Sequence, residues 1–195
     1  TRDPSSAASD VYKRQDHNRV LPYLDVPFQH AHPDVLKRMA RPSNNVHDLE
    51  QISEWRSINP DLSIRSTFIV GFPGETESEF NFLLDWLEEA KIDRVGCFKY
   101  ENVSGARSNE MEGHLHDDII QDRYDRFMSR AQQLSELKLK EKVGKTFTCV
   151  IDSVEQDHLI CRSIFDAPDI DGIVSVPNKQ RHYRVGERVT VKIKG

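Results

Sequence analysis

Three short apolar runs recur along the first two thirds of this chain and predict strands. They cover residues 20–28, 63–70 and 94–100. Each run is mostly apolar rather than alternating, which is typical of a parallel sheet that is covered on both faces. Helical stretches separate the runs, so the pattern favours an α/β unit.

Four helices are predicted between and after these strands. One begins at Pro33, because proline fits a first helical turn, and a second covers about residues 46–58, where apolar side chains recur every three residues. A third begins after Thr76, since Glu79 follows at the capping-box spacing. A longer amphipathic helix covers about residues 117–143.

The pattern changes after Gly144, a residue suited to end the long helix. Short strand-like runs with turns between them replace the helical spacing and predict an all-β module. The simplest such fold is a small barrel or OB-like sheet. The four runs are residues 146–153, 158–163, 172–177 and 188–194.

The chain therefore divides into three predicted segments. Residues 1–15 mix small, polar and charged side chains without periodicity. We interpret them as a disordered leader, either native or foreign sequence from cloning. Residues 16–143 form the α/β unit with its long helix, and residues 144–195 form the β module.

Composition excludes several classes of protein. The 195 residues are 37% hydrophobic and 30% charged, which is a globular composition, and no apolar run is long enough to span a bilayer. The formal net charge of −5 argues against nucleic-acid binding by bulk charge, although residues 179–188 carry cations for a local basic patch. An odd number of cysteines argues against a disulfide framework, so we expect a cytoplasmic protein.

No metal-binding motif occurs in the sequence. The three cysteines are Cys97, Cys149 and Cys161, and neither CxxC nor CxxxCxxC is present. We expect these cysteines to be small buried side chains. The eight histidines are scattered, and we expect them at the surface. The chain itself is therefore predicted to supply no metal ligand.

Polar residues follow the predicted strands and are candidates for chemistry. Gln29 and His30 follow the first strand, and Lys99 lies at the end of the third. In βα-barrels the active site lies at the carboxyl ends of the strands. In the turn 71–76, after the second strand, two glycines would let the backbone approach a ligand, and the helix start would favour an anion. Structural or surface roles for these residues stay open as alternatives.

The middle strand adds two polar side chains on one face. Arg65 and Thr67 are two residues apart, so they point the same way from a strand. An arginine inside a barrel needs a carboxylate or a ligand as its partner. Arg65 is therefore a candidate for either kind of contact.

Three segments, taken in order, resemble the later strands of the radical S-adenosylmethionine methylthiotransferases. They are residues 23–30, 65–76 and 94–100. The β module resembles the TRAM domain of the same family, and the likeness covers about residues 20–195. The resemblance implies the later part of an open βα-barrel followed by a small OB-like TRAM barrel, with truncation of that barrel left open.

The resemblance also implies an enzyme with cofactors. Members of the family use S-adenosylmethionine and two 4Fe–4S clusters, one of them held by a CxxxCxxC loop, to transfer a methylthio group. Because no such loop occurs here, the resemblance implies a C-terminal fragment that is inactive alone and holds no cluster. The residues that it places in the cofactor cavity are Gln29, His30, Arg65, Thr67, Gly71, Glu75 and Lys99.

Residues 163–172 resemble the RimO-type branch of the family, which modifies an aspartate of ribosomal protein S12. Asp166, Asp169 and Asp171 would suit a basic protein or the small ribosomal subunit, and they would repel phosphate. The basic side chains within residues 179–188 leave an RNA contact through the TRAM module open as a possibility. Two alternatives stay open: a methylthiotransferase of tRNA adenosine (the MiaB type), and a binding module for RNA or protein without catalysis.

Overall fold

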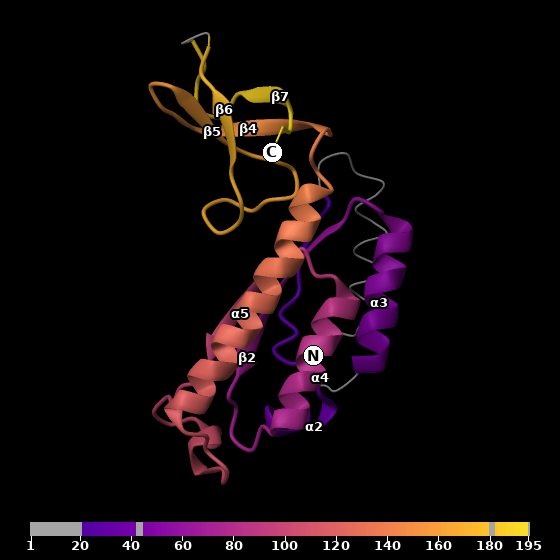
Figure 1. The fold of residues 1–195 in the computed structure, drawn as a ribbon, viewed down its shortest axis with the longest axis vertical. Coiled ribbons are helices and arrows are strands. Elements are labelled where there is room, and N and C mark those ends of the chain that lie inside the picture. Colours follow the sequence, from indigo (N-terminus) through magenta and orange to yellow (C-terminus); the bar gives the residue numbers. More distant parts are fainter. Residues whose placement is uncertain (1–20, 42–44, 180–181, 195) are drawn as a thin grey trace.

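Two units, an α/β layer and a β module, are joined by one long helix (Figure 1). The computed structural model describes residues 21–41, 45–179 and 182–194. The sequence-predicted leader lies outside these ranges. The α/β layer occupies one end of the molecule, and the β module lies beyond the last turn of the long helix.

The α/β layer is built on a parallel sheet with the strand order β1–β2–β3, as the apolar runs predict. Its first strand is shorter than expected, because the prolines on both sides of it cannot donate to a strand partner. The strands are β1 (Tyr23–Asp25), β2 (Ser63–Val70) and β3 (Arg94–Lys99).

The helices begin where the sequence predicts. At the start of the third, the Thr76 side chain accepts a hydrogen bond from the Glu79 N–H, and the Glu79 carboxylate accepts one from the Thr76 N–H, which confirms the capping box. No helix in the described ranges is both long and apolar enough to cross a membrane. The helices are α2 (Pro33–Arg38), α3 (Asn45–Ile58), α4 (Glu77–Ala90), the short 3-10 helix η1 (Arg107–Glu110) and α5 (Asp117–Lys140).

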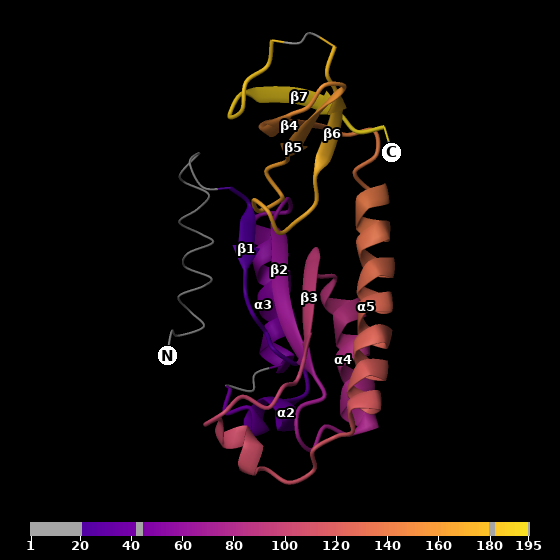
Figure 2. The ribbon, with the colours of Figure 1, turned by 90° about the vertical axis from the view of Figure 1, so that its left-hand side faces the viewer.

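The main core lies between one face of this sheet and helices α3, α4 and α5 (Figure 2). Trp55, Phe68, Phe80 and Phe127 are fully buried there, one from each of α3, β2, α4 and α5. The opposite face, which we call the open face, has no helix against it in the described residues, and Phe98 is 65% exposed on it. The expectation of a sheet covered on both faces is therefore wrong for the described part, because an apolar run does not reveal how many of its faces are packed.

The β module is one antiparallel sheet with the strand order β6–β5–β4–β7. Cys149, Ile151, Leu159 and Cys161 form its fully buried centre. All four predicted strands are present, but β6 and β7 do not pair with each other in the described ranges, so the sheet is a curled half-barrel rather than the closed barrel expected. The strands are β4 (Thr146–Val154), β5 (His158–Arg162), β6 (Val174–Pro177) and β7 (Arg188–Lys192).

Gly71, directly after β2, is expected to be intolerant of a side chain. Its φ of +81° favours glycine, and an added Cβ would lie 2.7 Å from two side-chain carbons of Ile120. We expect Gly71→Ala to lower the free energy of unfolding of the intact protein by about 2–4 kcal/mol, from overpacking plus backbone strain. The matched control is Gly105→Ala, which has the same φ but no atom within 4 Å and should cost about 1 kcal/mol. Equal losses in chemical denaturation would show that the Ile120 contact is unimportant.

Candidate functional site

The sequence-predicted site residues lie at opposite ends of the sheet rather than in one cavity. Gln29, His30, the turn 71–76 and Lys99 lie at the carboxyl ends of the parallel strands. Arg65 lies near the amino end of β2, where it contacts the β module. The carboxyl-end cluster and the module junction are therefore distinct places on the molecule.

A buried ion pair is the centre of the carboxyl-end cluster. Arg123 of α5 donates from Nη1 to Oε1 of Glu75 (2.7 Å) and to the Glu75 carbonyl oxygen (2.9 Å). The other carboxylate oxygen of Glu75 accepts the N–H of Gly71 (3.0 Å). Burial raises the pKa of Glu75, whereas Arg123 and the backbone N–H groups oppose that rise. The carboxylate thus ties the turn after β2 to α5, and it is enclosed rather than facing a cavity.

His30 is fully buried beside this pair. Its Nδ1 accepts a hydrogen bond from the His32 N–H (2.9 Å), and its Nε2 lies 3.6 Å from Oε2 of Glu75. Burial lowers the pKa of His30 to about 3, so the ring is neutral at pH 7 and carries its proton on Nε2. The expectation that the histidines lie at the surface is wrong for His30, because the chain after β1 turns it toward the start of α4.

The backbone N–H groups of the turn after β2 already donate hydrogen bonds to other groups of the chain. Besides Gly71, the N–H of Gly74 donates to the carbonyl oxygen of Gly113 (2.8 Å), and the N–H of Glu75 donates to that of Phe72 (2.9 Å). These groups are therefore not directed at a ligand in the way that the turn sequence suggested. Their partners instead fix the loop before α5 against the start of α4.

Gln29, Thr67 and Lys99 occupy three different settings. Gln29 has a φ of +69°, and its N–H donates to the carbonyl oxygen of Thr67 (2.9 Å). Thr67 lies on the open face beside Gly96, which has no side chain to cover it. Lys99 is on the helix-covered face, where its Nζ donates to Gln121 Oε1 (3.0 Å). Of the three, Thr67 lies on the open face, Lys99 points toward α5, and Gln29 is bridged through its backbone to β2 at Phe68.

The module junction is built on Arg65 and a buried carboxylate of the β module. Nη1 of Arg65 donates to Oδ1 of Asp171 (3.0 Å), and Nε lies 3.6 Å from Oδ2 of Asp25. The second oxygen of Asp171 accepts the hydroxyl of Tyr23 (2.6 Å) and the N–H of Ala167 (2.9 Å). The sequence predicted that Arg65 has either a carboxylate or a ligand as its partner, and the partner is the carboxylate of Asp171.

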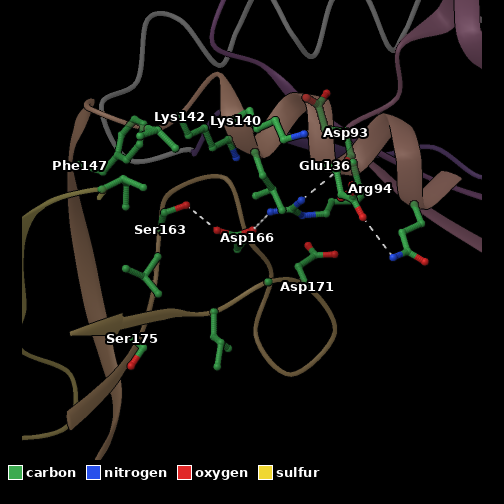
Figure 3. A pocket seen from close by; sticks show the side chains of 18 of the residues that line it. Asp93, Arg94, Glu136, Lys140, Lys142, Phe147, Ser163, Asp166, Asp171 and Ser175 are labelled. Atoms are coloured by element: carbon green, nitrogen blue, oxygen red, sulfur yellow. Dashed lines mark hydrogen bonds and ion pairs between the residues drawn. The ribbon is translucent and has the colours of Figure 1, made fainter. Parts of the chain in front are cut away.

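A second ion pair joins the same two units (Figure 3). Arg94 pairs through Nη2 with Asp166 Oδ1, and the other oxygen of Asp166 accepts the hydroxyl of Ser163 (2.5 Å). Ser63 donates its hydroxyl to the Phe165 carbonyl oxygen (3.2 Å). The first residue of every strand in the α/β sheet therefore contacts residues 163–172, which we call the junction loop.

A groove of about 1860 Å³ opens beside this junction. Helix α5, strand β3 and the β module line it, and the Arg94–Asp166 pair lies in its wall (Figure 3). Lys140 and Lys142 also line it at the end of α5. The groove could not be recognised from the sequence, because its walls come from segments about 100 residues apart that only folding brings together.

Sequence reasoning missed Arg123 and Arg94. A signal for Arg123 was present, because it falls between Ile120 and Phe127 on the apolar stripe of α5. A cation on such a stripe needs a buried partner, which proves to be Glu75. Arg94 gave no comparable signal, since its partner is 72 residues away.

The three cysteines do not fit an iron–sulfur cluster. Cys97 is buried in the α/β layer, whereas Cys149 and Cys161 lie in the separate core of the β module. Burial raises the pKa of Cys97 to about 12 and that of Cys149 to about 11. Cluster ligation requires several converging thiolates, and this arrangement offers neither convergence nor ready ionisation.

One group of potential metal ligands lies outside the predicted site. Ligand atoms of His32, Asp34 and Glu79 lie within 4.8 Å of one another. However, His32 Nδ1 accepts the Asp34 N–H (3.2 Å), and Glu79 accepts hydrogen bonds from Arg38 (2.8 Å) and from the start of α4. His32 and Glu79 are therefore already engaged, as helix caps and in the ion pair with Arg38.

Comparisons with known proteins show what the chain is similar to. Residues 143–195 match the TRAM domain, which agrees with the curled antiparallel sheet found there. The α/β layer and this domain together are similar to bacterial methylthiotransferases.

The relatives are all named ribosomal protein uS12 methylthiotransferase RimO. The relative from Ruegeria sp. (strain TM1040) is 54% identical over 177 residues, which are 90% of this chain and 38% of the relative. The Paracoccus denitrificans relative is 55% identical over 174 residues, with 89% and 38% covered. The Cupriavidus necator relative is 51% identical over 195 residues, with 98% and 44% covered. The predicted resemblance to the RimO type is confirmed, and the chain spans about two fifths of the length of these relatives.

Removal of Arg123 is expected to leave Glu75 buried without a counter-charge. We expect Arg123→Met to lower the free energy of unfolding of the intact protein by about 3–5 kcal/mol at pH 7. The loss should shrink toward pH 5, because burial keeps the pKa of Glu75 raised and a protonated carboxyl group no longer needs the cation.

The matched control is Arg126→Met, one turn along α5. Arg126 pairs with the exposed Glu77 at the surface (2.7 Å), and such a pair contributes about 0–1 kcal/mol. Chemical denaturation at both pH values measures the two variants. Equal losses, or a loss for Arg123→Met that grows at pH 5, would contradict this account.

Proposed function

We propose that this chain is part of an enzyme that transfers a methylthio group to an aspartate of ribosomal protein uS12 in the cytoplasm. The observation that carries the proposal is the identity of 51–55% to relatives of that name over about 90% of the chain. Because the chain spans about two fifths of those relatives, the activity is proposed for the whole protein. The chain alone is proposed to be inactive.

The cofactors proposed for the whole protein are S-adenosylmethionine and two 4Fe–4S clusters. When bound, they supply in this family a radical that takes hydrogen from an unactivated carbon. The cysteines of this chain do not fit a cluster, so the ligands would come from elsewhere in the protein.

The part of this chain proposed to face S-adenosylmethionine is the carboxyl end of the open face. Thr67 would contribute a hydroxyl group there, since it lies on that face, and Gln29 would contribute an amide group from the segment bridged to the end of β2. His30, Gly71 and Glu75 would hold the adjoining turn in place through the buried network around Arg123. Arg65 and Lys99 stay in the proposed set with less support, because each already has a partner in the chain.

The partner proposed for the whole protein is uS12, free or within the small ribosomal subunit. The TRAM match supports an additional contact with RNA, for which the basic side chains near Arg184 and Arg188 are the proposed site. The name that these relatives share favours this assignment over modification of tRNA adenosine and over a module without catalysis.

A chimaeric enzyme tests the proposed activity. The segment of the Paracoccus denitrificans relative that matches this chain is replaced by residues 20–195. We expect the chimaera to add one methylthio group to uS12, as measured by mass spectrometry of the protein, because the two segments are 55% identical. The unmodified relative is the control for enzyme quality. A methylthiolated tRNA with unmodified uS12 would show that the chain belongs with the tRNA-modifying enzymes.

Anaerobic reconstitution of the chain alone tests the cofactor proposal. We expect no stoichiometric binding of iron and sulfide, because the three thiols are buried in two separate cores and resist ionisation. Iron analysis and visible absorption are the measurements, with the chimaera as the positive control. A stoichiometric cluster on the chain alone would overturn the assignment of cluster ligands to the rest of the protein.

A further inference from the structure

We infer that the junction loop positions the TRAM module rather than contacting the protein substrate. In this account Asp166 and Asp171 hold the module at a set orientation against the amino ends of the strands. The module then presents uS12 to the distant carboxyl ends. This inference rests on the proposed function, and it replaces direct recognition of a basic partner by Asp166, Asp169 and Asp171.

The burial of the two carboxylates argues against direct recognition. The side chains of Asp171 and Asp166 are 2% and 5% exposed. Both oxygens of each carboxylate already accept hydrogen bonds within the chain, from Arg65, Tyr23 and the Ala167 N–H at Asp171 and from Arg94 and Ser163 at Asp166. A basic partner would have to displace these donors before it reached either carboxylate.

The geometry of the contacts is that of a two-point attachment. Asp171 is held by β1 and β2, while Asp166 is held by the neighbouring strand β3. One ion pair would let the module pivot about it, whereas two pairs on different strands restrain rotation as well as separation. The carbonyl oxygen of Phe165 adds a contact with Ser63 between them.

The junction loop also contacts the segment just beyond the end of α5. Lys142, just beyond that helix, places its ammonium group 4.9 Å from the centre of the Phe165 ring. The module is therefore attached at the helix end and at the junction loop, and the groove of about 1860 Å³ lies between α5, β3 and the module. Loss of the loop contacts would leave the helix end as the main attachment and would change the width of this groove.

The segment that resembles the uS12-modifying branch is this same loop. Its acidic residues would then determine specificity through the orientation of the module and not through their own contacts. Asp169 separates the two explanations, because it is exposed and forms no ion pair or hydrogen bond within the described ranges. Direct recognition makes Asp169 the most important of the three, whereas positioning makes it the least important.

The experiment compares variants of the chimaeric enzyme described above. Asp166→Asn with Asp171→Asn removes both ion pairs, Asp169→Asn removes the exposed charge, and Asp157→Asn, in the β4–β5 turn, is the matched surface control. Spin labels on α4 and on β5 report the distance between the two units. KM and kcat are measured for intact uS12 and for a short peptide around the modified aspartate.

We expect the double variant to broaden the distance distribution and to raise KM for intact uS12 about tenfold or more, because misplacement of a docked substrate is costly. Its kcat for the short peptide should change by less than about twofold, since a peptide does not need the module. Asp169→Asn should behave like Asp157→Asn in every measurement. The swapped pair Arg94→Asp with Asp166→Arg, on an otherwise unchanged chain, should keep a narrow distribution, whereas Arg94→Asp alone should not.

Two results would overturn the inference. One is an unchanged distance distribution in the double variant, and the other is a rise in KM for Asp169→Asn that matches that of the double variant. Thermal unfolding shows whether the double variant is folded. If it is not folded, Asp171→Asn alone is measured instead, and we expect the same changes in the distance distribution and in KM. Failure of the unsubstituted chimaera to modify uS12 would overturn the proposed function instead, while the distance measurement would still test the attachment.

Discussion

Two ion pairs between neighbouring strands and one loop determine how the two units of this protein are placed. Arg65 and Arg94 each hold a carboxylate of residues 163–172 that is nearly removed from solvent. Either carboxylate, if left unpaired there, would be strongly destabilising, so the loop is restrained to this arrangement. The position of the β module and the shape of the groove beside it depend on that restraint.

Another buried ion pair lies at the opposite end of the sheet. Glu75 and Arg123 are buried together, and His30 is kept neutral beside them. Their role is to connect the turn after β2 with α5. The open face and its carboxyl end are then the proposed place for a ligand. The two ends of the sheet therefore have different tasks: one attaches the module, and the other borders the proposed cofactor site.

If the proposed substrate is a basic protein, this division explains how acidic residues of one loop can matter without touching it. A carboxylate that is saturated by donors of its own chain contributes geometry rather than charge to an interface. The proposed methylthiotransferase activity then needs both ends of the sheet at once, because the substrate is held at one place and reacts at another. The exposed groups of the β module remain available for the proposed contacts with uS12 or RNA.

The local structure and the resemblance to the RimO type followed from the amino-acid sequence alone. Apolar spacing predicted every strand of both sheets and the start of α4, because capping and periodicity depend on residues only a few positions apart. It also indicated that Arg65 needs an anionic partner. Folding brings Asp171 to Arg65, buries His30 and pairs Arg123 with Glu75. It also leaves one face of the parallel sheet open in the part of the chain that the structure describes. These features depend on residues as many as 106 positions apart, and the burial of a charge is set by the segments that fold around it rather than by its neighbours in the chain.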